Sequence, residues 1–163
     1  MENNNGISNF FIDSILKSVK NNSYYYGVYS ANNIPTHLIT KKNFSIISNL
    51  SNVGENGSHF ITIIAYCNYV LYLDSFGLPC INENIATFLN SLKRPIFYNA
   101  TQIQDFSSLF CGYYCVLFVL FFNHHKKNKH LQMHFNNANL LENDNKCVMY
   151  ICKFIKVLRN KKH

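Results

Sequence analysis

The spacing of apolar residues along the chain predicts an amphipathic helix near the N-terminus and two further helices. Residues 8–20 place apolar side chains three and four positions apart, with Ser8 or Asn9 available as the N-cap. Residues 82–92 fit a short helix, and residues 147–158 are periodic enough for a last one. These three segments place one helix near each end of the chain and a short helix in between.

Short segments rich in aromatic and β-branched residues predict strands between these helices. They cover residues 24–29, 44–50, 59–66, 69–74 and 95–98. Only Cys67 and Asn68 separate the third segment from the fourth, which is the spacing of a hairpin with a two-residue loop. The strands of this hairpin are therefore expected to pair in antiparallel fashion.

The longest apolar run, residues 109–122, contains Gly112 and is shorter than the roughly 20 residues of a membrane span. We therefore expect a buried central helix that begins at Cys111, and no association with a membrane. Together with the strands, this pattern predicts an α+β fold, in which a small antiparallel sheet is surrounded by helices. The whole chain, residues 1–163, is expected to form one domain.

The composition indicates a folded domain with a basic surface. Of the 163 residues, 48% are hydrophobic and only 14% are charged, and the chain contains 14 Phe and 11 Tyr. These values exclude a disordered tail, which would be poor in aromatic residues, and a coiled coil. The formal net charge of +7 favours a polyanionic partner, although a basic surface without any partner explains it equally well.

The six cysteines raise the question of disulfide bonds. The chain opens MENNNGISNF, without the basic and apolar segments of a secretory signal. We therefore expect a protein that is not secreted and whose thiols are reduced, so that some of them are candidates for catalysis. We also expect it to be a monomer.

Four residues occupy positions that suit catalysis by a nucleophilic cysteine. His59 begins one strand of the predicted hairpin and Asp74 ends the other, so Asp74 can orient the imidazole. Cys111 lies at the N-terminus of the apolar helix, where the helix dipole stabilises a thiolate. Gln104, in a polar loop upstream, can aim its amide at Cys111. Taken singly, each residue is better explained by a structural role, and the combination makes the two interpretations comparable.

Three segments around these residues carry a resemblance to a known family. They are GSHF at 57–60, YLDSFGLP at 72–79 and QIQDFSSLFCGYYC at 102–115. Together with YYYGVYSANNIP at 24–35, they resemble the adenovirus endopeptidases, or adenains. The adenain-like proteases of Maverick/Polinton elements and related large DNA viruses are the most similar. The resemblance covers about residues 24–122, most of the chain.

The resemblance implies a papain-like cysteine protease fold, shared with the proteases of ubiquitin-like proteins, in which the central helix carries the nucleophile. By position in the motifs, it implies that Cys111 is the nucleophile and that His59 is the general base. It further implies that Asp74 orients this base. Gln104 and the backbone N–H of Cys111 would form the oxyanion hole.

The chain departs from the family pattern at several positions. Phe60 follows the histidine where the family usually has Trp, which changes the packing over the imidazole. Asp74 stands where the adenoviral enzymes have Glu. Lys93 occupies the place of the cysteine that binds the activating peptide of those enzymes, so covalent activation is in doubt. Gln102 fits the motif spacing poorly, and Cys115 is expected in the core.

Basic and histidine-rich segments near the C-terminus are candidates for binding DNA and metal. The resemblance implies DNA as an activating polyanion, bound without regard to sequence through phosphate contacts. The basic residues concerned are Lys126, Lys127, Lys129, Arg159, Lys161 and Lys162. A second group lacks the tight spacing of a zinc site, so solvated side chains are the favoured interpretation. It consists of His124, His125, His130, His134, Cys147 and Cys152. No cofactor is expected for the chemistry, and DNA or a short peptide is the candidate activator.

The resemblance predicts an endopeptidase that cleaves viral or transposon-encoded capsid or core precursors during particle maturation, after small residues such as glycine. It would act in the nucleus or cytoplasm of a host, or packaged in the virion. The same four residues would serve a protease for ubiquitin or a ubiquitin-like modifier. Outside the enzymes, the alternative is a catalytically inactive, basic virion protein that binds DNA.

Overall fold

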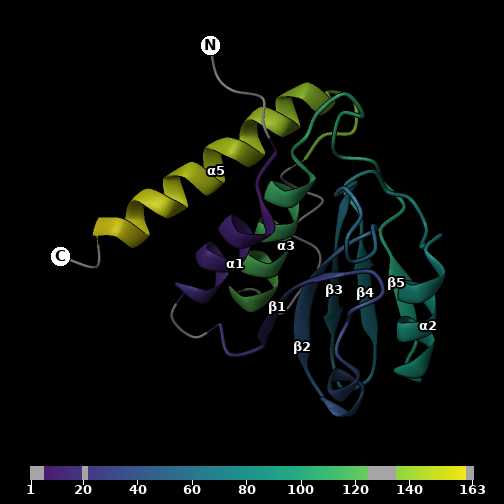
Figure 1. The fold of residues 1–163 in the computed structure, drawn as a ribbon. Coiled ribbons are helices and arrows are strands. Elements are labelled where there is room, and N and C mark those ends of the chain that lie inside the picture. Colours follow the sequence, from purple (N-terminus) through teal and green to yellow (C-terminus); the bar gives the residue numbers. More distant parts are fainter. Residues whose placement is uncertain (1–5, 20–21, 125–134, 161–163) are drawn as a thin grey trace.

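The computed structural model describes residues 6–19, 22–124 and 135–160, and its fold is α+β (Figure 1). A five-stranded mixed sheet has the order β1-β2-β3-β4-β5. Its strands are β1 (Tyr25–Ser30), β2 (Phe44–Asn49), β3 (Phe60–Ala65), β4 (Val70–Leu73) and β5 (Ile96–Tyr98). The helices are α1 (Asn9–Lys17), α2 (Glu83–Ser91), α3 (Cys111–His124) and α5 (Leu140–Asn160), with a 3₁₀ helix η1 (Thr36–Thr40).

The sheet is mixed, so the prediction of an antiparallel sheet is wrong at its edges. The outer pairs β1–β2 and β4–β5 are parallel. Parallel neighbours need a long crossover connection, and residues 31–43 with η1 and residues 74–95 with α2 provide it. The central pairs are antiparallel, and the predicted hairpin of β3 and β4 is confirmed. It closes where the N–H of Tyr66 donates to the carbonyl of Tyr69 at 2.8 Å.

Helices cover both faces of the sheet, so that its central strands β2, β3 and β4 are buried on both sides. Ile47, Ile64 and Leu71 pack on one face with residues of α1, α3 and α5. Ile46 and Ile63, their neighbours along the strands, pack on the other face with residues of α2 and η1. Figure 1 shows α1 and α3 on one side of the sheet and α2 on the other. Because successive side chains of a strand alternate in direction, each of these central strands contributes to two separate cores.

Helix α3 begins at Cys111, as predicted, and is apolar on all sides. Its residues 114–120 are all buried, Cys115 among them, because α1, α5 and the sheet pack around the helix. In its first turn, a Cβ atom on Gly112 would lie only 2.7 Å from Cγ1 of Ile7, so the N-terminal segment packs closely here. The N–H groups of Tyr113 and Tyr114 donate to the carbonyl of Phe110 at 2.9 and 3.2 Å. The N–H groups of Cys111 and Gly112, ahead of them, have no acceptor within the helix.

Helix α5 begins well before the predicted start at residue 147. Its first turns contain Asn143 and Asp144, whose side chains are fully buried. The amide of Asn143 donates to the carbonyl of Ile103 at 3.0 Å, and Asp144 Oδ1 accepts from the hydroxyl of Tyr114 at 2.9 Å. The predicted boundary is wrong because apolar spacing does not reveal a helix turn that is buried through polar contacts.

Three further sequence predictions concern the thiols, the membrane and the binding of DNA. All six cysteines carry free thiols. Among the helices of the described ranges, none combines the length and the apolar character that crossing a membrane requires. The predicted DNA-binding lysines at 126, 127, 129, 161 and 162 lie outside the described residues, as does the side chain of Arg159. DNA binding therefore stays a prediction.

Candidate active site

The structure brings His59 and Asp74 into direct contact at one end of the sheet. His59 immediately precedes β3 and Asp74 immediately follows β4, and the antiparallel pairing of these strands places the two residues together. His59 Nε2 lies 2.8 Å from Asp74 Oδ1, and the residues are only 9% and 2% exposed. Because an ionised carboxylate can only accept, Nε2 carries the hydrogen of this bond and Nδ1 is left for a second partner.

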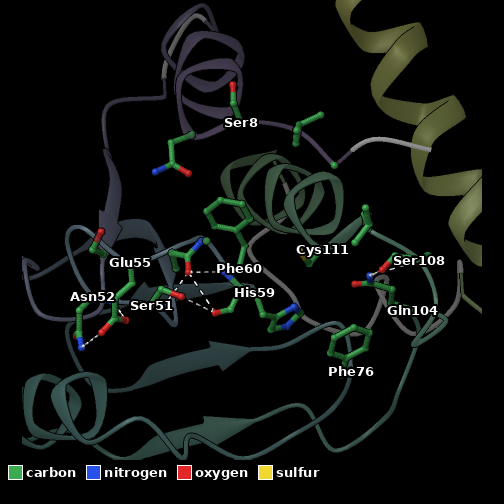
Figure 2. Close-up of a pocket in the computed structure, with 18 of the residues that line it drawn as sticks. Ser8, Ser51, Asn52, Glu55, His59, Phe60, Phe76, Gln104, Ser108 and Cys111 are labelled. Atoms are coloured by element: carbon green, nitrogen blue, oxygen red, sulfur yellow. Dashed lines mark hydrogen bonds between the residues drawn. The ribbon is translucent and has the colours of Figure 1, made fainter. Parts of the chain in front are cut away.

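Cys111, at the start of α3, lies beside the imidazole in the same cleft (Figure 2). Burial by itself lowers the pKa of His59, but the interactions with Asp74 and Cys111 outweigh this effect and raise the pKa to about 9. The imidazole is therefore protonated at neutral pH. A protonated imidazole beside a thiol stabilises the thiolate, which is the nucleophilic form of cysteine.

One aromatic ring stacks on the imidazole, and a second ring packs behind the first. Phe76 stacks on His59 with ring centroids 4.4 Å apart and ring planes 16° apart, and Phe106 packs on Phe76 at 4.8 Å. The sequence predicts that Phe60 packs over the imidazole. In the structure the ring stacked on the imidazole is that of Phe76, and Phe60 packs against the core cluster that includes α3. Sequence reasoning missed Phe76, and the available signal was its place two residues after Asp74, in the same turn.

Asp74 is fixed by its own turn and by one neighbouring side chain. The N–H of Phe76 donates to the same Oδ1 atom that binds the imidazole, at 2.8 Å. Asn99, just after β5, accepts from the N–H of Asp74 at 2.7 Å and donates to its carbonyl. Asn99 therefore fixes the backbone of Asp74, and the carboxylate cannot rotate away from His59 without also losing the bond from Phe76.

Gly77 brings this turn against the segment that carries Gln104. Its φ is +68°, a left-handed conformation that favours glycine. A Cβ atom there would lie 2.7 Å from the backbone carbonyl carbon of Thr101 and 2.8 Å from the nitrogen of Gln102. No other residue fits this position without moving one backbone segment away from the other.

The amide of Gln104 is fully buried and is held at both of its ends. Oε1 accepts from the hydroxyl of Ser75 at 2.5 Å, and Nε2 donates to the carbonyl and hydroxyl oxygens of Ser108 at 3.0 and 3.1 Å. Because a backbone carbonyl can only accept, Nε2 is the atom that faces Ser108. Gln102, the poorer fit to the motif, donates instead to the backbone carbonyl of Gln104 at 2.9 Å.

His59, Cys111 and Gln104 line one cleft with a volume of about 700 Å³ (Figure 2). Residues 6–10, which lead into α1, form part of its wall. In the view of Figure 2, Glu55 lies toward the opposite end of the cleft from Gln104. Cys111, His59 and Gln104 thus line the same space.

No family model and no curated protein matches this chain. The resemblance to the adenovirus endopeptidases therefore rests on its motifs. These motifs supply much of the cleft, since residues 57–60, Phe76, Gln104 and Cys111 all line it.

The structure offers little support for a metal centre. Among the described residues, no group of three or more histidine, cysteine or acidic side chains could hold a metal ion. Of the candidates from the sequence, Cys147 is buried and Cys152 is exposed on α5. His125, His130 and His134 lie outside the described residues, as does the side chain of His124.

The raised pKa of His59 should make the stability of the fold depend on pH. Because the pKa rises from 6.5 to about 9 on folding, the protonated imidazole stabilises the folded state, fully below pH 6.5 and progressively less up to about pH 9. The contribution is on the order of 3 kcal/mol. Urea unfolding should show that wild type exceeds His59→Gln in stability by more at pH 6 than at pH 9.5. An equal difference at both pH values would contradict this prediction.

Proposed function

We propose that this protein is a cysteine endopeptidase in which Cys111 is the nucleophile. The observation that carries the proposal is the imidazole of His59, which lies between a buried carboxylate and a thiol and has its pKa raised to about 9. A cysteine at a helix N-terminus beside such a base is the arrangement that nucleophilic catalysis requires. The clamped amide of Gln104 in the same cleft adds a donor for the oxyanion.

In the proposed acylation step, the proton of the Cys111 thiol resides on Nδ1 of His59, while Nε2 stays bonded to Asp74. The sulfur attacks the carbonyl carbon of the substrate, and the π electrons of the carbonyl bond move to its oxygen. His59 then gives its proton to the leaving amine as the C–N bond breaks, which leaves a thioester on Cys111. Water that loses a proton to His59 hydrolyses this thioester and frees the acid product.

In this proposal the oxyanion is bound by the backbone N–H of Cys111 and by Nε2 of Gln104. The first N–H groups of a helix have no acceptor within the helix. In the structure Nε2 bonds both oxygens of Ser108, so in this proposal one of its two hydrogens passes from Ser108 to the oxyanion when substrate binds. Each such donor contributes about 10²- to 10³-fold to the rate of acyl transfer.

The substrate class in this proposal is the one that the resemblance implies, precursor polypeptides of a virus or transposon that are cleaved during particle maturation. DNA, as a polyanion, is the proposed activator, since the chain carries a net charge of +7. Binding through phosphate contacts would weaken steeply with added salt.

Selective alkylation of thiols tests the proposal without a known substrate. Iodoacetamide reacts with thiolates, and at about pH 6 an ordinary thiol is almost entirely protonated. Mass spectrometry can compare all six cysteines of the chain in one experiment. We expect Cys111 to react about a hundredfold faster than the exposed Cys67 and Cys152, and to lose this advantage in His59→Ala. If Cys111 reacts no faster than Cys67, the proposal is wrong.

A further inference from the structure

Three consecutive residues after β4 all contact the candidate site. Asp74 binds the imidazole of His59, and Phe76 stacks on the same ring. Ser75, between them, contacts Gln104 instead of His59. The proposed function gives roles in the chemistry to Asp74 and Gln104 but leaves the Ser75 hydroxyl without one.

Ser75 binds the backbone and the side chain of the residue that carries the amide. Its carbonyl accepts from the N–H groups of Ile103 and Gln104 at 2.9 and 3.0 Å, and its hydroxyl donates to Oε1 of Gln104 at 2.5 Å. The side chains of Ser75 and Gln104 are 1% and 0% exposed. Water therefore has no access to replace the hydroxyl as the partner of Oε1.

We propose that Ser75 is a positioning residue of the oxyanion hole, whose hydroxyl fixes the place of the Gln104 amide beside the cleft. This inference rests on the proposed function. Ser75 supplies a donor to Oε1 and Ser108 supplies acceptors to Nε2, so the amide is held between the two residues. Loss of the Ser75 donor leaves Oε1 buried and unpaired, so the amide is held at Nε2 alone and shifts from its place.

Ser75→Ala isolates this role, because the two backbone bonds that Ser75 accepts remain in the variant. The test compares two reagents that need no peptide recognition. Iodoacetamide transfers its carbamoylmethyl group to the sulfur of Cys111 by displacement of iodide, with no oxyanion. p-Nitrophenyl acetate acetylates the same sulfur through a tetrahedral oxyanion and releases p-nitrophenolate. Mass spectrometry of modified Cys111 measures the alkylation rate. Release of p-nitrophenolate, less the release by Cys111→Ala, measures the acetylation rate, because the acetyl thioester is itself hydrolysed.

We expect Ser75→Ala to lower the acetylation rate of Cys111 about tenfold, because a displaced donor loses part of its effect on the oxyanion. The alkylation rate should stay within about twofold of wild type, since the thiolate and imidazolium remain in place. Ser91→Ala is the matched control. Its hydroxyl donates to the carbonyl of Phe88 on α2, and both rates should stay unchanged in this variant.

A double-mutant cycle shows whether Ser75 acts through Gln104. In the Gln104→Ala background, Ser75→Ala should produce no further loss of acetylation rate. An equal loss in both backgrounds, a parallel loss of acetylation and alkylation, or no loss at all would each overturn the inference.

The wild type separates this inference from the proposed function. If Cys111 of the wild-type protein reacts selectively with neither reagent, the proposed function fails and the inference fails with it. If Cys111 is selective in the wild type but Ser75→Ala behaves like Ser91→Ala, only the inference fails.

Discussion

Cys111→Ala should abolish the cleavage of polypeptides, with a loss of about 10⁴-fold or more, because no other group in the cleft can form the thioester. Cys111 is only partly buried, so the removal of its sulfur should leave the stability of the fold nearly unchanged. The measurement is incubation with a peptide library prepared from whole-cell protein, followed by mass spectrometry of the newly formed termini.

Cys152→Ala is the control for this prediction, because it removes a thiol that is exposed on α5. The control should produce the same new termini as wild type, at the same rate. New termini that form as fast with Cys111→Ala as with wild type would contradict the assignment of Cys111 as the nucleophile.

Gln104→Ala should lower kcat about 10²- to 10³-fold and leave KM nearly unchanged, because the amide acts on the oxyanion and not on the bound substrate. Gln104 is buried, and its loss leaves Ser75 and Ser108 without a partner, so some loss of stability is expected as well. Alkylation of Cys111 at the wild-type rate would show that the remainder of the site is intact. The kinetics are measured on a peptide that wild type cleaves in the library.

Gln102→Ala provides a matched control, two positions away in the same loop. Its amide donates to the carbonyl of Gln104 and not toward Ser108, so kcat should fall by much less than in Gln104→Ala. If Gln102→Ala lowers kcat as strongly as Gln104→Ala does, the amide of Gln104 has no special role in the oxyanion hole.

Features of the fold that depend on neighbouring residues could be predicted from the sequence. Ser8, one of the two N-cap candidates before the first apolar repeat, caps α1. The two-residue loop fixes the pairing of β3 with β4, and this pairing places His59 beside Asp74. Half of the candidate site is therefore encoded in a single hairpin.

The contacts that could not be predicted join segments far apart along the chain. The hydroxyl of Ser75 meets an amide 29 residues later, and nothing in the local pattern around either residue indicates this pairing. The parallel pairing of the edge strands depends in the same way on how the crossovers run. The stacking of Phe76 on His59 likewise follows from the path of the turn after β4 and not from apolar spacing.

The turn of residues 74–77 also limits which substitutions, insertions and deletions the protein can accept there. Four successive positions meet four separate requirements: a carboxylate for the imidazole, a hydroxyl for the amide, a ring over the imidazole and a glycine against Thr101. A substitution alters one of these contacts and leaves the other three. An insertion or deletion of one codon shifts all of them at once, so a change of length in this segment should be more damaging than any single substitution.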